Sequence, residues 1–183
     1  MLTLEVDDPP RLGNAYGLAD VSGLWRAAQV KAQCEKRLAC DLLTRARWPY
    51  YLPMGEAQTY SGRKRRVTQV PLFKGYLFFA APADEDVSDV FQTQRVLRVI
   101  QINDQDRFRR EIENVERALS VNPRIEACPF AVEGARVRVS RGPLIGVEGT
   151  VIRRAEGAMV VLGVSGFGNA VIEIVADFLE PAA

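Results

Sequence analysis

The chain has 183 residues, of which 48% are apolar and 26% are charged, and its formal net charge is +1. This composition is typical of a globular protein, and no apolar run reaches the roughly 18 residues that a membrane helix needs. The absence of histidine excludes serine–histidine–aspartate triads, cysteine–histidine pairs and histidine-ligated metals. Cys34, Cys40 and Cys128 form no CxxC pair, so we expect buried, reduced thiols, no metal site and no cofactor.

The positive charge is concentrated in one part of the chain. Residues 1–20 carry a net charge of −3 and residues 123–183 carry −1, whereas residues 24–80 hold eleven Lys and Arg against three acids, a net charge of +8. Such asymmetry indicates one basic surface that meets a polyanion. The acidic segment 1–20 lacks the features of a secretory signal, and we interpret it as a flexible leader on a cytoplasmic protein.

Short strands and one helix are predicted after this leader. The helix prediction rests on apolar residues that recur at i, i+4, and Pro49 ends the pattern. Ser61-Gly62 is a turn signal. The expected elements are a strand over 24–30, a helix over 31–47, a strand over 50–52, a hairpin or mobile loop with a basic tip over 54–66, and strand again over 67–80.

Three further elements complete an α+β plan: a short helix over 84–93, a strand over 96–102 and a helix over 106–121. We expect one largely antiparallel sheet with its helices on one face. The other face must then be polar or have a partner. In the strand that follows Gly75, Tyr76 and Phe78 point to one face while Leu77 and Phe79 point to the other, so both faces are apolar.

The composition and the pattern of apolar residues change near residue 130. Residues 122–131 hold two prolines and few apolar residues, which indicates a linker. Residues 132–183 show short alternating strands with glycine turns and no helical pattern, which predicts a small all-β barrel. Gly142, Gly146 and Gly149 should supply positive φ angles or tight turns there.

Motifs in both regions resemble the NusG family of transcription elongation factors. Trp25 lies on the first strand, a basic helix follows it, and then come Tyr-Leu-Pro at 51–53, PLFKGYLF at 71–78 and VRVSRGPLIGVEGTV at 137–151. The family joins an N-terminal NusG domain to a C-terminal KOW domain. The resemblance implies four parts: a leader, 1–20; a NusG-like domain, 21–121; a linker, 122–131; and a KOW domain, 132–183.

This resemblance implies a non-enzymatic factor that binds RNA polymerase. The family's open sheet face docks on the clamp helices of the large β′ subunit, and the matching positions here are Trp25, Phe73, Tyr76 and Phe78. Aromatic anchors of this kind would each contribute on the order of 1–3 kcal/mol. The residues alone leave a second interpretation open, in which the same aromatics form part of the core.

The basic residues also admit two interpretations. Four of them are consecutive at the expected hairpin tip: Arg63, Lys64, Arg65 and Arg66. They are either a solvated tip or a contact with phosphates of upstream or non-template DNA. Lys31, Arg37 and Arg95 are either solvated or match a patch that reads the non-template strand in RfaH, a specialised paralog. Where that patch has a histidine, this chain has Asp41.

For the KOW domain, the resemblance implies a second protein partner, either a ribosomal protein of the small subunit or the termination factor Rho. The family's contact segment matches 165–168, and we expect Phe167, Gly168 and Asn169 to contribute. Asn169 stands where the general factor usually has Arg. The glycines and the many β-branched residues favour a permanent barrel over one that refolds into helices.

Residues 65–79, RRVTQVPLFKGYLFF, resemble RfaH more closely than the general factor, and Lys74 replaces the usual proline. We therefore expect a monomeric, operon-directed elongation and antitermination factor without catalytic residues. Two alternatives stay open. One is the housekeeping general factor, and the other is a KOW-containing RNA- or ribosome-binding protein in which Tyr50 or Tyr51 would stack on bases.

Overall fold

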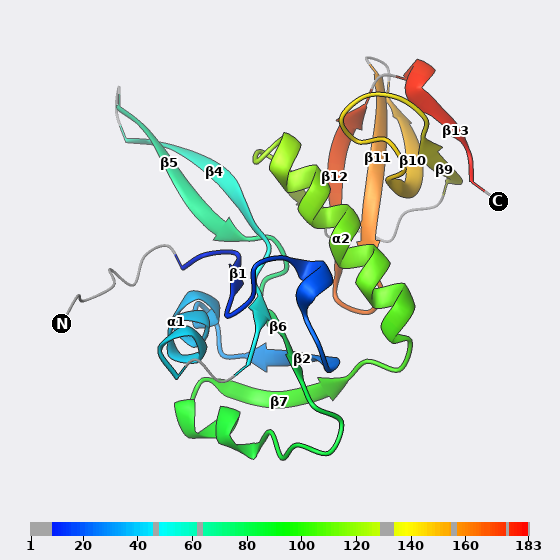
Figure 1. Cartoon of the computed structure of the whole chain (residues 1–183). Helices are drawn as coiled ribbons and strands as arrows, with labels where there is room; N and C mark the ends of the chain where they lie inside the picture. Colours follow the sequence, from blue (N-terminus) through cyan, green and yellow to red (C-terminus); the bar gives the residue numbers. More distant parts are fainter. Residues whose placement is uncertain are drawn as a thin grey trace. The chain divides into compact units, whose positions relative to one another are not determined.

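The structure is a computed structural model that describes residues 9–45, 48–61, 64–128, 134–154, 157–174 and 176–182 (Figure 1). Its contacts divide the chain into two compact units, Met1–Pro53 with Phe73–Gln105 and Met54–Leu72 with Asp106–Ala183. The predicted α+β class is confirmed, with antiparallel sheets, few helices and an all-β C-terminal region. Within the described residues, no helix is long and apolar enough to cross a membrane.

A five-stranded antiparallel sheet forms the first unit, in the order β1-β3-β6-β2-β7. Its strands are β1 (Leu12–Gly13), β2 (Leu24–Val30), β3 (Tyr50–Tyr51), β6 (Tyr76–Ala81) and β7 (Val96–Gln101). The apolar strand β6 lies between β3 and β2, and from Leu77 to Ala81 every residue of it is buried. A continuous buried run of this kind is typical of a strand that is covered on both faces.

The helices of this unit are shorter than the sequence predicts. Helix α1 (Glu35–Arg45) begins four residues later than expected because Gln33 adopts a left-handed φ of 60°. The helix expected over 84–93 is a 3-10 helix, η2 (Ser88–Thr93). The Asp86 carboxylate accepts hydrogen bonds from the backbone N–H of Ser88 at 2.8 Å and from its hydroxyl at 2.9 Å, which closes a local turn before the helix begins.

The expectation of a flexible leader over 1–20 is wrong for the part that the structure describes. Leu12 and Gly13 pair with Tyr51 and Tyr50 of β3, and a 3-10 helix, η1 (Leu18–Asp20), follows. The Asn14 amide donates to the carbonyl oxygens of Leu42 at 3.1 Å and of Trp48 at 2.9 Å. This segment therefore closes one edge of the sheet and holds the region after α1.

The second unit combines a β-ribbon, one long helix and a sheet. The ribbon pairs β4 (Met54–Ser61) with β5 (Lys64–Pro71), which confirms the hairpin interpretation of 54–66. Helix α2 (Gln105–Val121) buries Phe108, Ile112, Val115 and Leu119, the four residues of the predicted apolar face.

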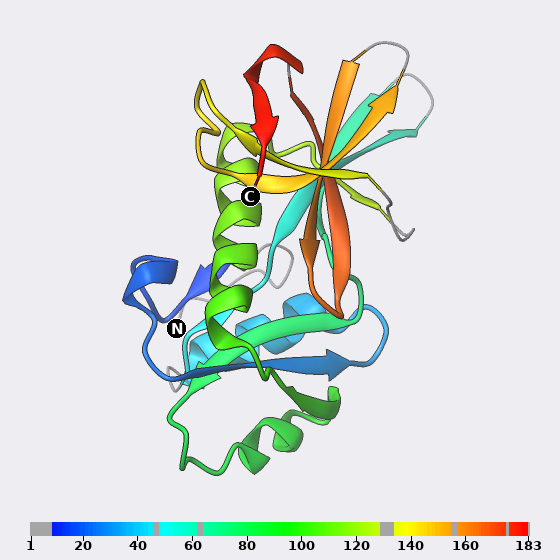
Figure 2. The same cartoon turned by 90° about the vertical axis from the view of Figure 1, so that its right-hand side faces the viewer.

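The sheet of this unit has six antiparallel strands in the order β13-β9-β10-β11-β12-β8. Figure 2 shows its strands crossing at steep angles, as in a strongly twisted sheet. A short 3-10 helix, η3 (Ala176–Phe178), precedes the last strand. The strands are β8 (Glu126–Cys128), β9 (Ala135–Val139), β10 (Glu148–Arg154), β11 (Gly157–Val164), β12 (Gly168–Ile174) and β13 (Leu179–Pro181).

The segment 122–131, predicted to be a linker, contains a strand. Residues 126–128 pair with 169–171 of β12, and the Pro123 carbonyl accepts a hydrogen bond from the Glu56 N–H at 2.7 Å. A β-strand needs only its backbone groups for such pairing, so the low apolar content of the segment did not reveal it.

The glycines of the C-terminal sheet have two different functions. Gly142 and Gly146 adopt φ angles of 82° and 84° in the loop between β9 and β10, which confirms the expected positive φ. Gly149 lies within β10, where a Cβ atom would come within 2.5 Å of the Val161 carbonyl oxygen. It therefore permits the close approach of β10 and β11 and does not form a turn.

Candidate functional site

Three of the four predicted aromatic contact residues share one face of the N-terminal sheet. Ala27 lies opposite Phe78 and Gln29 opposite Tyr76. Trp25 is on the same face because residues i, i+2 and i+4 of a strand point the same way. Phe73 reaches this group from the preceding turn, with its ring 6.1 Å from that of Phe78 in an edge-to-face arrangement. The structure thus brings the four residues together.

The expectation that this face lies open is wrong. Trp25 and Phe78 are fully buried within the chain, and Phe73 is 3% exposed. Only Tyr76 is half-buried. Phe78 lies on the central strand, opposite Ala27 on one side and Tyr51 on the other, and Phe73 covers it from the turn. These aromatics contribute to the core, and Tyr76 is their accessible member.

The turn that carries Phe73 and Lys74 is anchored by a buried carboxylate. The Glu35 side chain is 6% exposed and accepts a hydrogen bond from the Gly75 N–H at 2.7 Å. The Gly75 carbonyl accepts a second bond from the Val30 N–H at 2.9 Å, and Gly75 has a φ of 83° that glycine adopts without strain. Lys74 is exposed at the apex of this anchored turn.

Two of the three basic residues expected to read the non-template strand lie next to each other. The Lys31 N–H donates to the Arg95 carbonyl at 2.8 Å. The Arg95 guanidinium donates to the Asp41 carboxylate at 2.7 Å, and this hydrogen bond raises the pKa of Arg95. Arg37 is exposed on α1. Asp41 therefore neutralises one of the cations of the patch and holds it in place.

The thiols near this patch are less buried than expected. Cys34 and Cys40 are free and half-buried. Burial, followed by the charge of Asp41, raises the pKa of the Cys40 thiol. A raised pKa favours the protonated thiol over the more reactive thiolate, and the expectation of reduced thiols stays a prediction. The side chain of Cys128 lies outside the described part of the chain.

The hairpin presents exposed cations, and part of its tip lies outside the described residues. Arg65 and Arg66 are exposed on β5. Lys64 begins this strand but its side chain lies outside the described residues, as does Arg63 entirely. One of the eleven basic residues counted over 24–80 is buried and does not belong to the basic surface. Arg26 is 3% exposed and donates hydrogen bonds to the carbonyls of Ala81 and Pro82.

The predicted partner-binding residues of the C-terminal sheet lie at the turn between β11 and β12. Ser165 and Gly166 are exposed, whereas Phe167, Gly168 and Asn169 are half-buried. The Phe167 N–H donates to the Val164 carbonyl at 2.9 Å, and Gly166 has a φ of 84°. We call residues 165–168 the C-terminal turn.

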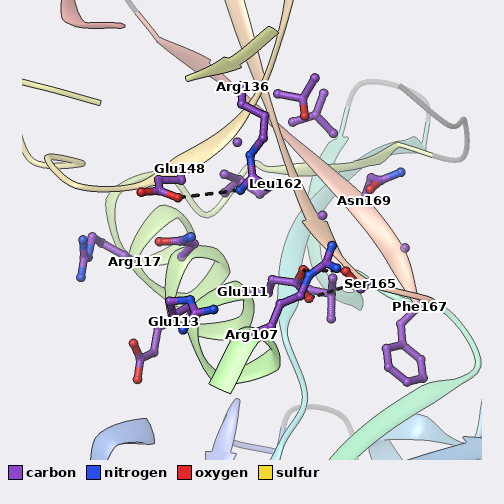
Figure 3. A pocket seen from close by; sticks show the side chains of 18 of the residues that line it. Arg107, Glu111, Glu113, Arg117, Arg136, Glu148, Leu162, Ser165, Phe167 and Asn169 are labelled. Carbon is purple, nitrogen blue, oxygen red and sulfur yellow. Dashed lines mark hydrogen bonds and ion pairs between the residues drawn. The ribbon is translucent and has the colours of Figure 1, made fainter. Parts of the chain in front are cut away.

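A groove in the second unit, with a volume of about 1100 Å³, links this turn to α2 (Figure 3). Its lining includes five arginines and three glutamates. Some of these charges are paired: Glu111 with Arg107, and Glu148 with both arginines of β9. The lining arginines are Arg107, Arg110, Arg117, Arg136 and Arg138, and the glutamates are Glu111, Glu113 and Glu148.

Two residues of α2 in this groove are absent from the sequence-based predictions. Glu111 accepts hydrogen bonds from Ser165, and the Arg117 guanidinium donates to the Ile145 carbonyl at 3.0 Å. The i, i+4 pair of Arg107 and Glu111 was visible in the sequence as a stabilising helix pair. Its position opposite the C-terminal turn depends on tertiary structure, and no local pattern indicates it.

Comparison with known proteins identifies a protein family whose model matches this chain. The model of the family described as "Transcription termination factor nusG" matches residues 23–118, more than half of the chain. This span runs from the start of β2 almost to the end of α2 and contains the aromatic face, the basic patch and the hairpin. The C-terminal turn lies beyond it. No curated protein sequence matches the chain.

Solved structures with a similar fold include a chain described as "Domain interaction in Thermotoga maritima NusG". It is 16% identical with a TM-score of 0.51, and the match covers 91% of this chain and 100% of that one. A chain described as "Crystal Structure of MjSpt4:Spt5 complex conformation B" is 18% identical with a TM-score of 0.29, and covers 87% and 97%. At 16% identity, the first likeness concerns the fold alone.

Proposed function

Because the chain belongs to the NusG family of transcription factors, we propose that it is a non-enzymatic elongation and antitermination factor that acts in the cytoplasm. Its N-terminal sheet binds the β′ clamp helices of RNA polymerase and suppresses pausing or termination. Its C-terminal sheet is a KOW domain that engages a second partner. The observation that carries the proposal is the family match, which spans the strands that hold the aromatic face.

Polymerase binding uses the surface around Tyr76. Tyr76 is half-buried and Lys74 is exposed beside it, on a turn that Glu35 and Val30 hold in place. A preformed turn lowers the entropic cost of binding. Trp25 and Phe78 are buried in this conformation, so they join the contact only if polymerase binds a conformation that exposes them. Binding one polymerase state more tightly than another shifts the equilibrium between the two states.

The exposed cations of the N-terminal region contact DNA phosphates. Arg65 and Arg66 lie along β5 of the ribbon. Lys31 lies before α1, and Arg37 lies on α1. Phosphate contacts of this kind add affinity without sequence preference and weaken as salt rises. Arg95 contributes to the non-template strand patch in an orientation that Asp41 sets.

The C-terminal assignment rests on the loop between β9 and β10. Residues 137–151 carry the KOW pattern, and Gly142 and Gly146 have the positive φ angles that such a loop needs. The Gly146 N–H donates to the Val139 carbonyl at 2.7 Å and closes the loop. Phe167, Gly168 and Asn169 then contact the second partner, a ribosomal protein of the small subunit or Rho.

Within the family, we propose an RfaH-like, operon-directed monomer. Lys74 and the stretch 65–79 support this choice. The housekeeping general factor is the alternative, and genome-wide occupancy separates the two. Enrichment on a few operons identifies a specialised factor, whereas even coverage of transcribed genes identifies the general one.

A pull-down of core RNA polymerase with the full chain tests the proposal. Tyr76→Ala removes an accessible aromatic from the contact, and we expect retention of polymerase to fall by about tenfold or more, as for an interface hot spot. Tyr16→Ala is the matched control, because Tyr16 is fully exposed. Normal polymerase binding by a folded Tyr76→Ala protein would contradict the proposed surface. Binding of free RNA without polymerase binding would favour the RNA- or ribosome-binding class.

A further inference from the structure

Two exposed cations lie near Tyr76, the accessible member of the aromatic face. Gln29 of β2 lies opposite Tyr76 of β6 and also opposite Arg98 of β7. Directly opposed residues of antiparallel strands share one face of the sheet, so Tyr76, Gln29 and Arg98 form a row across three strands. Lys74 precedes Tyr76 by two residues, at the apex of the turn. We call Lys74, Tyr76, Gln29 and Arg98 the cationic row.

Gln29 orients the Arg98 side chain. Its amide oxygen accepts a hydrogen bond from Arg98 Nε at 2.6 Å. Arg98 is exposed, and within the described residues no carboxylate forms an ion pair with it. Because Nε is already used, the two terminal nitrogens of the guanidinium remain for a second partner. Their parallel N–H groups match the two oxygens of a carboxylate.

The backbone of the turn determines where Lys74 lies. The Tyr76 N–H donates to the Phe73 carbonyl at 3.2 Å, and Gly75, the third residue of this four-residue turn, has a φ of 83°. A positive φ at the third residue alone is the pattern of a type II turn, which favours proline at its second position. Lys74 occupies that second position. The chain therefore has a long cationic side chain where the backbone alone favours proline.

No acid of the described part of the chain pairs with Lys74. Lys74 is exposed and forms no ion pair there. Glu35, the acid that contacts this turn, is 6% exposed, and its Oε1 atom accepts the bond from the Gly75 N–H. A solvated cation contributes little to the stability of a fold. Beside an accessible aromatic residue, the same cation is positioned to pair with an acid of a partner protein.

We propose that Lys74 and Arg98 select an acidic protein surface, with carboxylates on both sides of the contact that Tyr76 makes. The row spans two interstrand spacings, which places the Cα atoms of Tyr76 and Arg98 about 10 Å apart. Two acidic residues seven positions apart on a helix are separated by about 10 Å as well. The inference rests on the proposed function, because it assigns a charge to the polymerase helices that bind Tyr76.

The composition of the row favours a protein over a nucleic acid. Nucleic acids are held mainly through phosphates that follow one another along a strand. Here a tyrosine and an amide separate the two cations. Ile100, which lies two residues after Arg98 on the same face, is half-buried and adds apolar surface. Tyrosine and arginine next to apolar surface are typical of protein interfaces.

The experiment measures the association and dissociation rate constants of the full chain with core RNA polymerase at several salt concentrations. Lys74→Gln with Arg98→Gln removes both cations. We expect the association rate constant to fall about tenfold at low salt and to depend less on salt, because charges at an interface act mainly on association. The matched control, Arg45→Gln with Arg124→Gln, removes the same charge from exposed positions outside the row and should behave as the wild type does.

Three single variants separate charge from folding. Lys74→Pro introduces the residue that the turn favours, so the midpoint of urea unfolding should stay or rise while association slows several-fold. Lys74→Arg keeps the charge and should associate as the wild type does. Tyr76→Ala should instead raise the dissociation rate constant, since the loss of a packed contact acts mainly on dissociation.

Equal effects of the double variant and its matched control would overturn the proposal. So would unchanged polymerase association in the double variant, and a loss of single-stranded oligonucleotide affinity in its place would assign the cations to a nucleic acid. If Tyr76→Ala weakens polymerase binding while the cation variants leave it unchanged, the proposed function stands and only the charge assignment is wrong. A wild-type chain that binds no polymerase would overturn both.

Discussion

The two candidate protein-binding surfaces of this chain are built in opposite ways. The aromatic face of the N-terminal sheet is part of a core: Trp25, Phe73 and Phe78 are buried. The C-terminal turn lies at the end of the β11–β12 hairpin, with Ser165 exposed and Phe167 half-buried. The difference shows that a residue can lie on the predicted face of a sheet and still be inaccessible to a partner protein.

This contrast decides how each surface can be examined by mutation. Truncating a buried aromatic removes packing that the fold needs, so lost binding and lost folding coincide. Truncating a residue of the turn removes local contacts, such as the packing of Phe167 on Phe108, but no fully buried side chain. The following predictions compare the two surfaces, in order of decreasing effect.

Phe78→Ala should cause the largest loss of stability. Removing a fully buried phenylalanine costs about 3–5 kcal/mol of the free energy of unfolding. The two tryptophans of the chain, Trp25 and Trp48, are both buried in the first unit. Tryptophan fluorescence in urea therefore reports on the unit that contains Phe78. Lys74→Ala, at an exposed position of the preceding turn, should change stability by less than about 0.5 kcal/mol. Similar midpoints for the two variants would refute the buried position of Phe78.

Phe167→Ala should have a smaller effect that is confined to the second unit. The side chain is half-buried and packs edge-to-face on Phe108. We expect a cost of about 1–2 kcal/mol from the lost burial and ring contact. Hydrogen exchange of the β11 and β12 amides should become faster, while the tryptophan transition stays in place. A shift of the tryptophan transition would show that the turn is as integral to the fold as the aromatic face.

Asp41→Asn should change stability least and nucleic-acid binding most visibly. The Arg95–Asp41 pair is about one-third exposed on both sides, and pairs of this kind contribute about 0.2–1 kcal/mol. Loss of the carboxylate leaves Arg95 available to a phosphate, so the salt dependence of single-stranded DNA binding should steepen by about one phosphate contact. Asp20→Asn, at an exposed position, is the control. An unchanged slope would remove Arg95 from the DNA surface.

The regular elements were predictable because their apolar residues are periodic. The strand 24–30 and the apolar face of α2 follow directly from spacing. The missed strands are short and depend on a partner. Leu12–Gly13 pairs with β3, and Glu126–Cys128 pairs with β12. A segment of two or three residues carries no period, and only the edge that it meets makes it a strand.

The candidate functional site also has features that the sequence predicts and features that depend on tertiary structure. Motifs located the aromatic residues, the basic hairpin and the C-terminal turn, and alternation placed Tyr76 and Phe78 on one face. Burial of that face depends on the neighbours of a central strand. Glu35 provides the clearest case, because its contact with Gly75 joins residues 40 positions apart. Nothing in the local sequence around either residue indicates this contact.

Strand β8 also limits how far the C-terminal sheet can move from α2. While Glu126–Cys128 is paired with β12, the connection between α2 and the sheet consists of residues 122–125. Four residues span at most about 14 Å. A tether this short keeps Glu111 at a high effective concentration near Ser165. Unpairing the three residues of β8 from β12 would remove this limit, so a small local opening would determine how readily Glu111 separates from Ser165.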